Sequence, residues 1–246
     1  MNQQQSSQPI SGVLLVDKPQ DWTSHDVVAC VRGRFRIKKV GHCGTLDPMA
    51  TGLLIIVVGR GTKLSQQLMG HSKTYTGTIL LGTETDSQDA MGKTTKINDY
   101  KNVTEEQIRQ IVKTFIGQQK QIPPMVSAVK KGGKKLYELA RQGKTIEREP
   151  REITIHTLEI LSINIPEIQI RVHCSKGTYI RTLAADIGEK LGCGGHLKEL
   201  RREKSGFFDV ADAYTMETIK SWEKEDLQPA VILYENVLEI LEHETE

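Results

Sequence analysis

Length, composition and charge exclude several classes of protein. The chain has 246 residues, of which 37% are hydrophobic and 26% charged, enough apolar material for one large packed domain or two small ones. Its longest uninterrupted apolar run, residues 53–58, is far too short to cross a bilayer. Residues 1–11 lack the basic start and apolar stretch of a secretory signal. We therefore expect a soluble cytoplasmic protein without membrane contact, whose polar N-terminus (residues 1–11) is disordered.

The net charge of +2 hides an uneven distribution of charges. Residues 217–246 contain nine acidic residues and two lysines, which leaves residues 1–216 with a net charge of +9. Within that part the bases gather in residues 32–39, which include no acid, and in residues 130–151. Such runs suit a phosphate backbone, but they also occur as solvated ends and faces of helices. Charge alone leaves both interpretations open.

The first part of the chain alternates between strand and helix signals. Residues 12–17 form an apolar run bounded by Gly and by Lys-Pro, which predicts a buried strand. Thr23 or Ser24 caps a following helix whose apolar residues recur at helical spacing. Residues 41–52 hold three glycines and one proline, which indicates a loop with unusual backbone geometry, and residues 53–58 predict a central strand. A catalytic loop beside a core strand is a plausible arrangement.

The remainder of the chain predicts several strands and two helices. Residues 73–81 alternate as a half-exposed strand does, and residues 104–107 form a capping box that begins a helix. Residues 153–163 and 168–174 predict two strands joined by a short turn, and a helix follows at 179–191. Neither an internal repeat nor a regular βαβ unit is visible. The predicted fold class is α+β, with a mixed, mostly antiparallel central sheet flanked by helices and loops.

No cofactor or metal motif is recognisable in the sequence. The four cysteines are widely scattered, which argues against a disulfide framework or a zinc ribbon and predicts reduced thiols. Two His-Cys dipeptides, at 42–43 and 173–174, offer metal ligands, but neighbours on a strand point to opposite sides. A glycine-rich nucleotide-binding motif of correct spacing is also missing. We therefore expect neither a cofactor nor a metal.

Five segments in a fixed order carry a resemblance to a known family. The most distinctive, GHCGTLDPMATGLL at residues 41–54, resembles the signature of the TruB family of pseudouridine synthases, bacterial enzymes that act on uridine-55 in the T-loop of tRNA. One such match would be weak, but the five segments together cover most of residues 10–210. The other four are GVLLVDKP (12–19), SKTYTG (72–77), IPPMVSAVKKGGKKLYELARQG (122–143) and CSKGTYIRTLAADIGEKLGCGGHLKELRR (174–202).

The resemblance implies a domain organisation and a substrate. Residues 12–216 would form a pseudouridine synthase catalytic domain, with the basic stretch 121–151 as an inserted RNA-gripping subregion. The enzyme would be a monomer that flips one uridine out of the T-arm of tRNA, with no guide RNA. Typical bacterial members continue into a small RNA-binding PUA domain. Residues 217–246 are too few and too acidic for that role, so we expect an acidic helical tail and no PUA domain.

The chemistry of the reaction points to one acidic residue. Isomerising uridine breaks a C–N bond and makes a C–C bond at the same sugar carbon, without redox change. This requires one carboxylate, as nucleophile or as base, and a pocket that retains the detached uracil. The 41–52 loop carries one acid, Asp47, whereas glycoside hydrolysis usually uses two carboxylates and a water. Taken alone, an Asp before Pro is more often a turn residue, but in the family this aspartate is catalytic.

The resemblance also assigns roles to six further residues. Arg181 corresponds to an arginine that pairs with the catalytic aspartate, and such a cation holds a carboxylate ionised. Tyr75 corresponds to a tyrosine that stacks on the target base and is a candidate for removing the C5 proton. Tyr179 and Leu200 match residues that line the uracil pocket, His42 matches one that enters the space left by the flipped nucleotide, and Lys18 is expected to contact substrate or support the loop.

Three functions remain open from sequence. They are an active uridine isomerase, a catalytically silent RNA-binding or RNA-folding protein on the same scaffold, and an unrelated structural domain with basic patches. The third agrees poorly with five ordered segments. The first two predict the same basic surface, but only the enzyme needs Asp47, Arg181 and Tyr75 together, and the sequence contains all three.

Overall fold

The computed structural model describes residues 10–125, 130–131, 134–135 and 146–243. The chain divides into two compact units. The first unit comprises the residues up to His71 together with those from Arg202 onward, and the second unit comprises Ser72–Arg201. Most of the N-terminus that we expect to be disordered, and much of the basic subregion expected at 121–151, lie outside the described residues.

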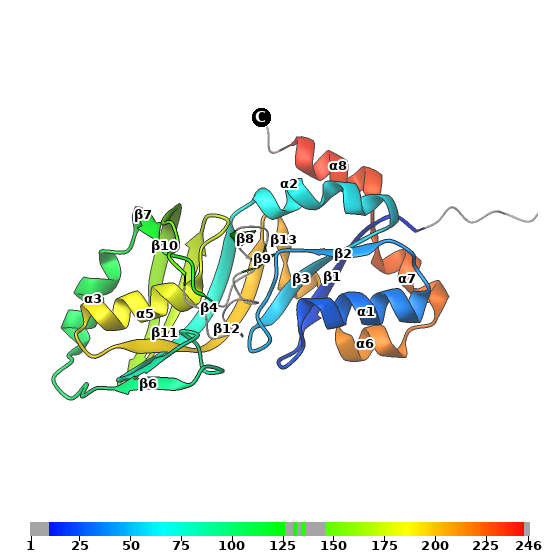
Figure 1. Ribbon diagram of the computed structural model, residues 1–246. Coiled ribbons are helices and arrows are strands. Elements are labelled where there is room, and N and C mark those ends of the chain that lie inside the picture. Colours follow the sequence, from blue (N-terminus) through cyan, green and yellow to red (C-terminus); the bar gives the residue numbers. More distant parts are fainter. Residues whose placement is uncertain (1–9, 126–129, 132–133, 136–145, 244–246) are drawn as a thin grey trace, which may run out of the picture. The chain divides into compact units, whose positions relative to one another are not determined.

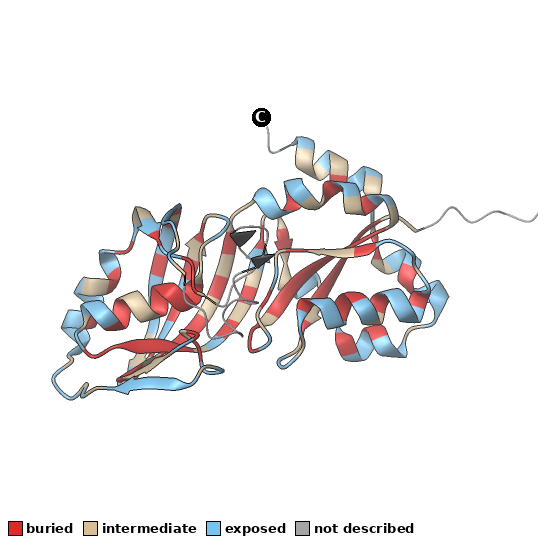
Figure 2. Ribbon diagram, in the orientation of Figure 1, coloured by how far each residue is buried: buried red, intermediate tan, exposed pale blue. Residues whose placement is uncertain are grey.

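Two long buried strands form the centre of the first unit (Figure 1). β1 (Gly12–Lys18) and β3 (Thr51–Val58) run antiparallel, with Gly12 opposite Val58 and Lys18 opposite Gly52. Both strands are nearly continuous apolar runs because they are buried along almost their whole length (Figure 2). Shorter strands extend this sheet: β2 (Val40–Cys43) is antiparallel to β3, β14 (Tyr214–Thr215) is parallel to β1, and β15 (Ile232–Leu233) is antiparallel to β1.

Helix α1 (Ser24–Phe35) begins at the predicted cap. The Thr23 hydroxyl accepts a hydrogen bond from the backbone N–H of Asp26, and the Asp26 carboxylate accepts one from the backbone N–H of Thr23. The buried residues of the helix include Val27, Val28, Val31 and Phe35, whose spacing predicted it. The other helical and short elements of this unit are η1 (Gly59–Leu64), α2 (Ser65–Gly70), β13 (Phe208–Asp209), η2 (Val210–Asp212), α6 (Met216–Ser221), α7 (Lys224–Ala230) and α8 (Tyr234–Glu242).

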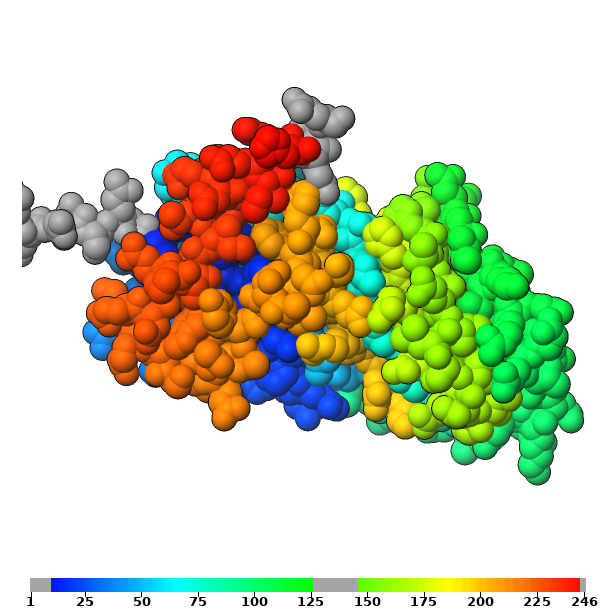
Figure 3. Space-filling view, turned by 180° about the vertical axis from the view of Figure 1, so that it is seen from behind, coloured from blue at the N-terminus to red at the C-terminus, as the bar shows by residue number. Residues whose placement is uncertain are grey.

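The acidic C-terminal segment contributes to the core of the first unit. Val237 of α8 is fully buried in the same cluster as Val13 and Leu15 of β1. The guanidinium carbon of Arg60 lies 4.6 Å from the ring centroid of Tyr234, the first residue of α8. Seen from behind, the C-terminal residues lie directly against the N-terminal ones (Figure 3). The segment is largely helical, and its apolar side chains pack against β1.

An antiparallel sheet forms the second unit. In order, β4 (Lys73–Leu81), β11 (Glu167–Cys174), β10 (Arg151–Asn164) and β7 (Gly117–Gln121) lie side by side, each antiparallel to the next. On its other side β4 neighbours β12 (Gly195–Ser205), whose last residues belong to the first unit. The α+β class with a mixed, mostly antiparallel sheet is therefore confirmed.

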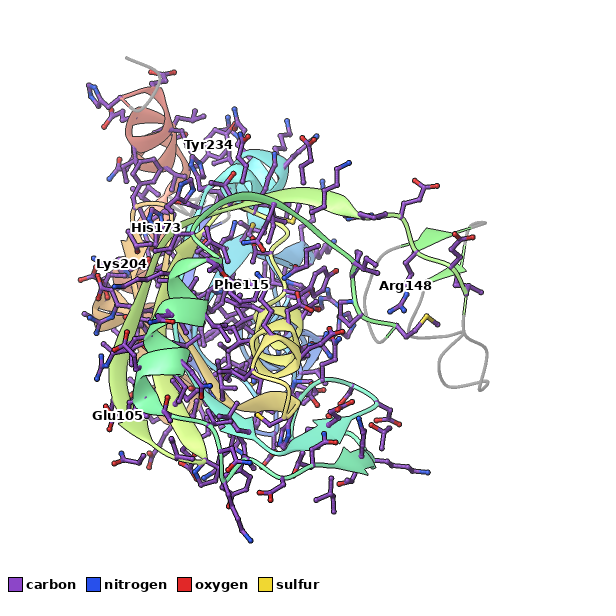
Figure 4. The ribbon with its side chains drawn as sticks, turned by 90° about the vertical axis from the view of Figure 1, so that its left-hand side faces the viewer. Glu105, Phe115, Arg148, His173, Lys204 and Tyr234 are labelled. Atoms are coloured by element: carbon purple, nitrogen blue, oxygen red, sulfur yellow. The ribbon has the colours of Figure 1, made fainter. Side chains whose placement is uncertain are left out.

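Two helices stand on one side of the sheet of the second unit, α3 (Glu105–Lys113) and α5 (Ile180–Lys190) (Figure 1). α3 begins at Glu105 after the predicted capping box at Thr104, and Phe115 follows its last turn (Figure 4). The Nζ atom of Lys190 lies 4.6 Å from the ring centroid of Phe115, so the two helix ends are in contact. Two short hairpins complete the unit: β5 (Thr83–Thr85) with β6 (Thr94–Ile97), and β8 (Lys130–Lys131) with β9 (Lys134–Lys135).

One local prediction needs correction. The Gly-rich segment is shorter than the expected loop of residues 41–52, because Val40–Cys43 pairs with β3 and buries its first and last side chains.

Two exposed bases of the run at 32–39 make hydrogen bonds within the first unit. Arg32 Nη2 donates to the carbonyl of Val40 at 3.1 Å, and Arg34 Nε donates to the carbonyl of Trp222 at 2.7 Å. These two guanidinium groups therefore stabilise the first unit.

Candidate active site

Asp47 lies on a tightly held loop between β2 and β3 of the first unit. Leu46, its neighbour, is buried, and its backbone N–H donates to Ser24 Oγ at 2.9 Å while its carbonyl accepts from that hydroxyl at 3.1 Å. On the other side, the carbonyl of Pro48 accepts from the backbone N–H of Asp21 at 2.9 Å. The two contacts bracket Asp47, whose half-buried position leaves part of it accessible. The loop thus presents one carboxylate from a fixed backbone.

Lys18 supports the Asp47 loop through a hydrogen bond to the residue that follows Asp47. Its side chain is fully buried, and Nζ donates to the carbonyls of Pro19 at 2.8 Å, Trp22 at 2.6 Å and Pro48 at 3.3 Å. Burial lowers the pKa of the Lys18 ammonium from 10.5 to about 8, although the negative charge of Asp47 opposes that shift. Of the two roles predicted for Lys18, the contact with Pro48 favours support of the loop.

Arg202 is a buried residue of this loop region that sequence reasoning missed. Its side chain is 1% exposed. Nε donates to the carbonyl of Leu53 at 2.7 Å, and Nη2 donates to the carbonyl of Gly44 at 3.0 Å. In the sequence it is the second base of an Arg-Arg pair, which resembles a solvated basic surface. Only the distant partners, reached by folding, distinguish it.

His42 lies on β2, and its surroundings favour the neutral form of its ring. Burial is the largest cause that lowers the pKa of His42, and the positive charges of Arg202 and His25 lower it further. Its Nδ1 atom is buried and has no hydrogen-bond partner within the described part of the chain. A neutral ring of this kind can enter an apolar space without the cost of burying a charge.

Arg181 lies in the second unit, in the first turn of α5, where it is paired with an acid. Its side chain is 4% exposed, and Nη1 lies 3.3 Å from Asp89 Oδ2 and 3.4 Å from the carbonyl of Ser87. Asp89 is itself held, because its Oδ1 accepts from Ser87 Oγ at 2.5 Å and from the backbone N–H of Met91 at 3.0 Å. The sequence gives no signal for Asp89, which lies 92 residues from its partner.

Tyr179 is the residue before α5, and a glutamine fixes its backbone. Its N–H donates to Gln121 Oε1 at 2.8 Å, and its carbonyl accepts from Gln121 Nε2 at 3.0 Å. This reciprocal pair replaces a side-chain cap at the start of the helix. Gln121 is thus a second supporting residue that the sequence did not reveal.

Tyr75 and Leu200 lie on neighbouring strands of the second unit. Both are nearly buried, Tyr75 on β4 and Leu200 on β12. Gly77 lies two residues along β4 and hence on the same face as Tyr75, and a Cβ built on it would be 3.4 Å from Leu200 Cδ1, an ordinary contact distance. The tyrosine and the leucine therefore belong to one apolar face.

The expected site residues fall into two groups. The first unit brings together Asp47, Lys18 and His42, and adds Arg202. The second unit holds the other four expected site residues, and the structure adds Asp89 and Gln121 as residues that support them. The expected pairing of Asp47 with Arg181 stays a prediction, because these residues belong to different units. The second group consists of Tyr75, Tyr179, Arg181 and Leu200.

The described residues contain neither a metal-binding cluster nor a membrane-spanning helix. Across residues 10–125 and 146–243, no three His, Cys, Asp or Glu side chains are grouped so that they could hold a metal ion. In the same part of the chain, every helix is too short or too polar to span a membrane.

Family models match almost the whole described chain. The model of the TruB family pseudouridylate synthase N-terminal domain matches residues 32–180, and that of the tRNA pseudouridylate synthase B C-terminal domain matches residues 181–240. The second match includes α6, α7 and most of α8. The C-terminal segment, expected as a tail, therefore has a family counterpart.

Curated relatives and solved structures agree with these matches. The chain is 46% identical to tRNA pseudouridine synthase B of Syntrophotalea carbinolica, over 91% of this chain and 73% of the relative. It is also 46% identical to the same-named protein of Opitutus terrae, over 93% and 95% respectively. The crystal structure of a Cbf5-Nop10-Gar1 complex contains a chain that matches with a TM-score of 0.70 and 31% identity, over 92% of this chain and 60% of that one. The protein belongs to the TruB family of pseudouridine synthases.

Proposed function

We propose that the protein isomerises uridine-55 in the T-loop of tRNA to pseudouridine, with Asp47 as the catalytic carboxylate. The observation that carries this proposal is the Asp47 loop itself. It offers one half-buried carboxylate, and hydrogen bonds at Leu46 and Pro48 fix the backbone on both sides. Such fixation lowers the entropic cost of placing the carboxylate at the reacting sugar carbon.

The reaction has two bond changes at that carbon. Asp47 acts there, as nucleophile or as base, while the C–N bond to uracil breaks; the detached base turns and a C–C bond forms. Tyr75 stacks on the base and is the candidate group for removing the C5 proton. Arg181 is the proposed partner of the Asp47 carboxylate, while Tyr179 and Leu200 line the uracil pocket. Every heavy atom of the product comes from the substrate, and the proton lost from C5 is balanced by one gained at N1, so the isomerisation itself requires no cofactor.

The uridine must leave the stacked T-loop before it can react. Unstacking and unpairing a nucleotide costs roughly a few kcal/mol. The neutral His42 ring can occupy the vacated space without a charge penalty. Exposed bases supply attraction for phosphates, among them Arg151 at the start of β10. We propose tRNA alone as the partner, without a guide RNA, with the protein acting as a cytoplasmic monomer.

The decisive experiment is Asp47→Asn, assayed on an unmodified T-arm stem-loop. We expect pseudouridine formation to fall below detection while RNA affinity changes by less than about twofold, since the amide keeps the shape of the side chain. The matched control is Asp99→Asn, which makes the same charge change at an exposed residue of the second unit. It should leave the rate nearly unchanged. Normal turnover by Asp47→Asn would refute the role of Asp47.

A wild-type protein that binds the stem-loop but forms no pseudouridine would favour the alternative, a silent RNA-binding protein. The same binding assay, repeated at several salt concentrations, tests the charge argument. Affinity should fall steeply between 50 and 200 mM salt, by ~10³-fold if about six phosphates are neutralised. Binding that is insensitive to salt would contradict a phosphate-directed surface.

A further inference from the structure

Arg202 is a buried cation whose hydrogen-bond partners are main-chain carbonyls. No carboxylate pairs with it within the described residues, and its hydrogen bonds end at Leu53 and Gly44. Burying a guanidinium without an acid is costly. A residue placed at that cost needs an explanation beyond packing.

The two carbonyls lie at opposite ends of the Asp47 loop. Gly44 is the first residue after β2, and Leu53 is the third residue of β3. One planar guanidinium therefore ties together the segment in which Asp47 is central. Its rigid fork suits this task because Nε and Nη2 point to two acceptors in a fixed relation. A lysine ammonium has no such fixed fork.

Two glycines of the loop lie so close to Arg202 that a side chain at either position would crowd it. A Cβ added at Gly44 would lie 3.3 Å from Arg202 Nη1, and one added at Gly52 would lie 2.3 Å from its backbone oxygen. Both glycines have positive φ angles, +87° and +97°, which other residues rarely adopt. The backbone of the loop thus closes around both the main chain and the side chain of Arg202.

The positive charge of Arg202 acts electrostatically on two groups near Asp47, Lys18 and His42. It lowers the pKa of Lys18 and of His42, which places the guanidinium close to both. Lys18 in turn interacts with Asp47. The other charged groups that act on Lys18 or His42 are Asp21, Asp26 and His25, and all three are exposed. The buried charges of this region are therefore two cations.

We propose that Arg202 is a positioning residue for the isomerisation, which fastens both ends of the Asp47 loop and keeps the Asp47 carboxylate ionised with a positive charge that no acid neutralises. This inference rests on the proposed function. It assigns Arg202 no contact with the substrate. Its effect on the reaction passes through the placement and the charge state of Asp47.

The test compares Arg202→Met, Arg202→Lys and the control Lys204→Met, an exposed base on the same strand. Single-turnover rates are measured at saturating stem-loop RNA. A misplacement of about 1 Å can cost ~10²-fold in rate, so we expect a loss of that order in Arg202→Met. Arg202→Lys should lose roughly tenfold, because it keeps the charge and gives up the fork. RNA affinity should change by less than about twofold in all three.

A pH profile separates the proposed role from a general weakening of the fold. Loss of the guanidinium should move the acid limb of the rate profile upward by about one pH unit in Arg202→Met, because Asp47 becomes easier to protonate. Arg202→Lys should restore the wild-type limb. A slower Arg202→Met enzyme with an unshifted acid limb would overturn the electrostatic part, and an unchanged rate would overturn the whole inference.

Two further outcomes are distinguishable. If Arg202→Met does not fold by circular dichroism, the rates of Arg202→Lys and Gly44→Ala decide, because the methyl added in Gly44→Ala would press on Nη1 of Arg202. A wild-type rate in Gly44→Ala together with a wild-type rate in Arg202→Lys would overturn the proposal. A wild-type protein without activity would refute the proposed function, and this inference with it. An active wild type with unaffected Arg202 variants would refute the inference alone.

Discussion

Among the described residues, each unit buries one arginine, and the two arginines are satisfied in different ways. In the second unit, Arg181 faces the carboxylate of Asp89, which is itself fixed by Ser87 and by a backbone N–H. In the first unit, Arg202 is satisfied by two carbonyl oxygens. Carbonyl dipoles stabilise a cation without cancelling its charge, whereas a carboxylate neutralises it locally. The comparison shows that hydrogen bonding and charge compensation are separate properties of a buried cation.

Removing Asp89 takes a buried carboxylate away from Arg181 and should give the largest effect on stability. Asp89→Ala removes the carboxylate whose Oδ2 lies 3.3 Å from Nη1 of the buried Arg181, and breaking a buried pair typically costs about 3–5 kcal/mol. Denaturant unfolding should show a loss of that order. The control Asp99→Ala removes an exposed carboxylate from the same unit and should cost less than about 1 kcal/mol. A loss below that value in Asp89→Ala would show that the Asp89 contact is not needed to stabilise the buried Arg181.

The second cation of the first unit allows a test by pH. The pKa of Lys18 is about 8 in the folded protein, below its ordinary 10.5, mainly because of burial. The unfolded chain therefore binds more protons between those two values, so the Lys18 contribution to the free energy of unfolding rises with pH across this window. Below pH 8 it is constant and unfavourable.

Lys18→Met isolates this contribution. The difference in unfolding free energy between wild type and variant should shift in favour of wild type by about 1–2 kcal/mol between pH 7.5 and 9.5. Denaturant titrations at the two pH values measure it. A difference that does not change with pH would show that Lys18 titrates outside this range and that burial does not shift its pKa.

Asp186 on α5 is a partly buried acid without a neutralising partner strong enough to offset its burial, and its removal should have the smallest effect of the three. Burial raises the pKa of its carboxyl from 3.8 to about 6, and Glu189 adds to the shift. The folded protein binds more protons than the unfolded chain between those values, so stability falls as pH rises through the window and stays reduced at neutral pH. Asp186→Asn should therefore raise the unfolding free energy at pH 7 by about 1 kcal/mol. That gain should vanish at pH 4; a gain of equal size at both values would indicate a packing effect instead.

Local features of the fold were readable from sequence because they depend on neighbouring residues. The apolar run of β1, the helix cap at Thr23, the capping box at Thr104 and the strand pair β10–β11 all appear where the pattern predicts them. β2 escaped prediction because its glycine suggests a loop, and only pairing with β3 makes it a strand.

The candidate site was predictable only in part. The family resemblance identified Asp47 and six companions by motif. It did not identify Arg202, whose acceptors lie 149 and 158 residues away, or Asp89, which lies 92 residues from Arg181. Supporting contacts of this kind depend on which backbone carbonyl or carboxylate folding brings near. Composition and hydrophobic periodicity do not predict such long-range contacts.

The pairing of β15 with β1 has a consequence for biosynthesis. Residues 232–233 complete a sheet that begins at residue 12, and Val237 fills the core beneath it. The first unit is therefore assembled from both flanks of the chain, whereas Ser72–Arg201 is contiguous. During translation the contiguous unit can mature while the ribosome is still reading the message. The Asp47 loop, by contrast, can form its hydrogen bonds to Arg202 only after that residue has been synthesised, late in translation.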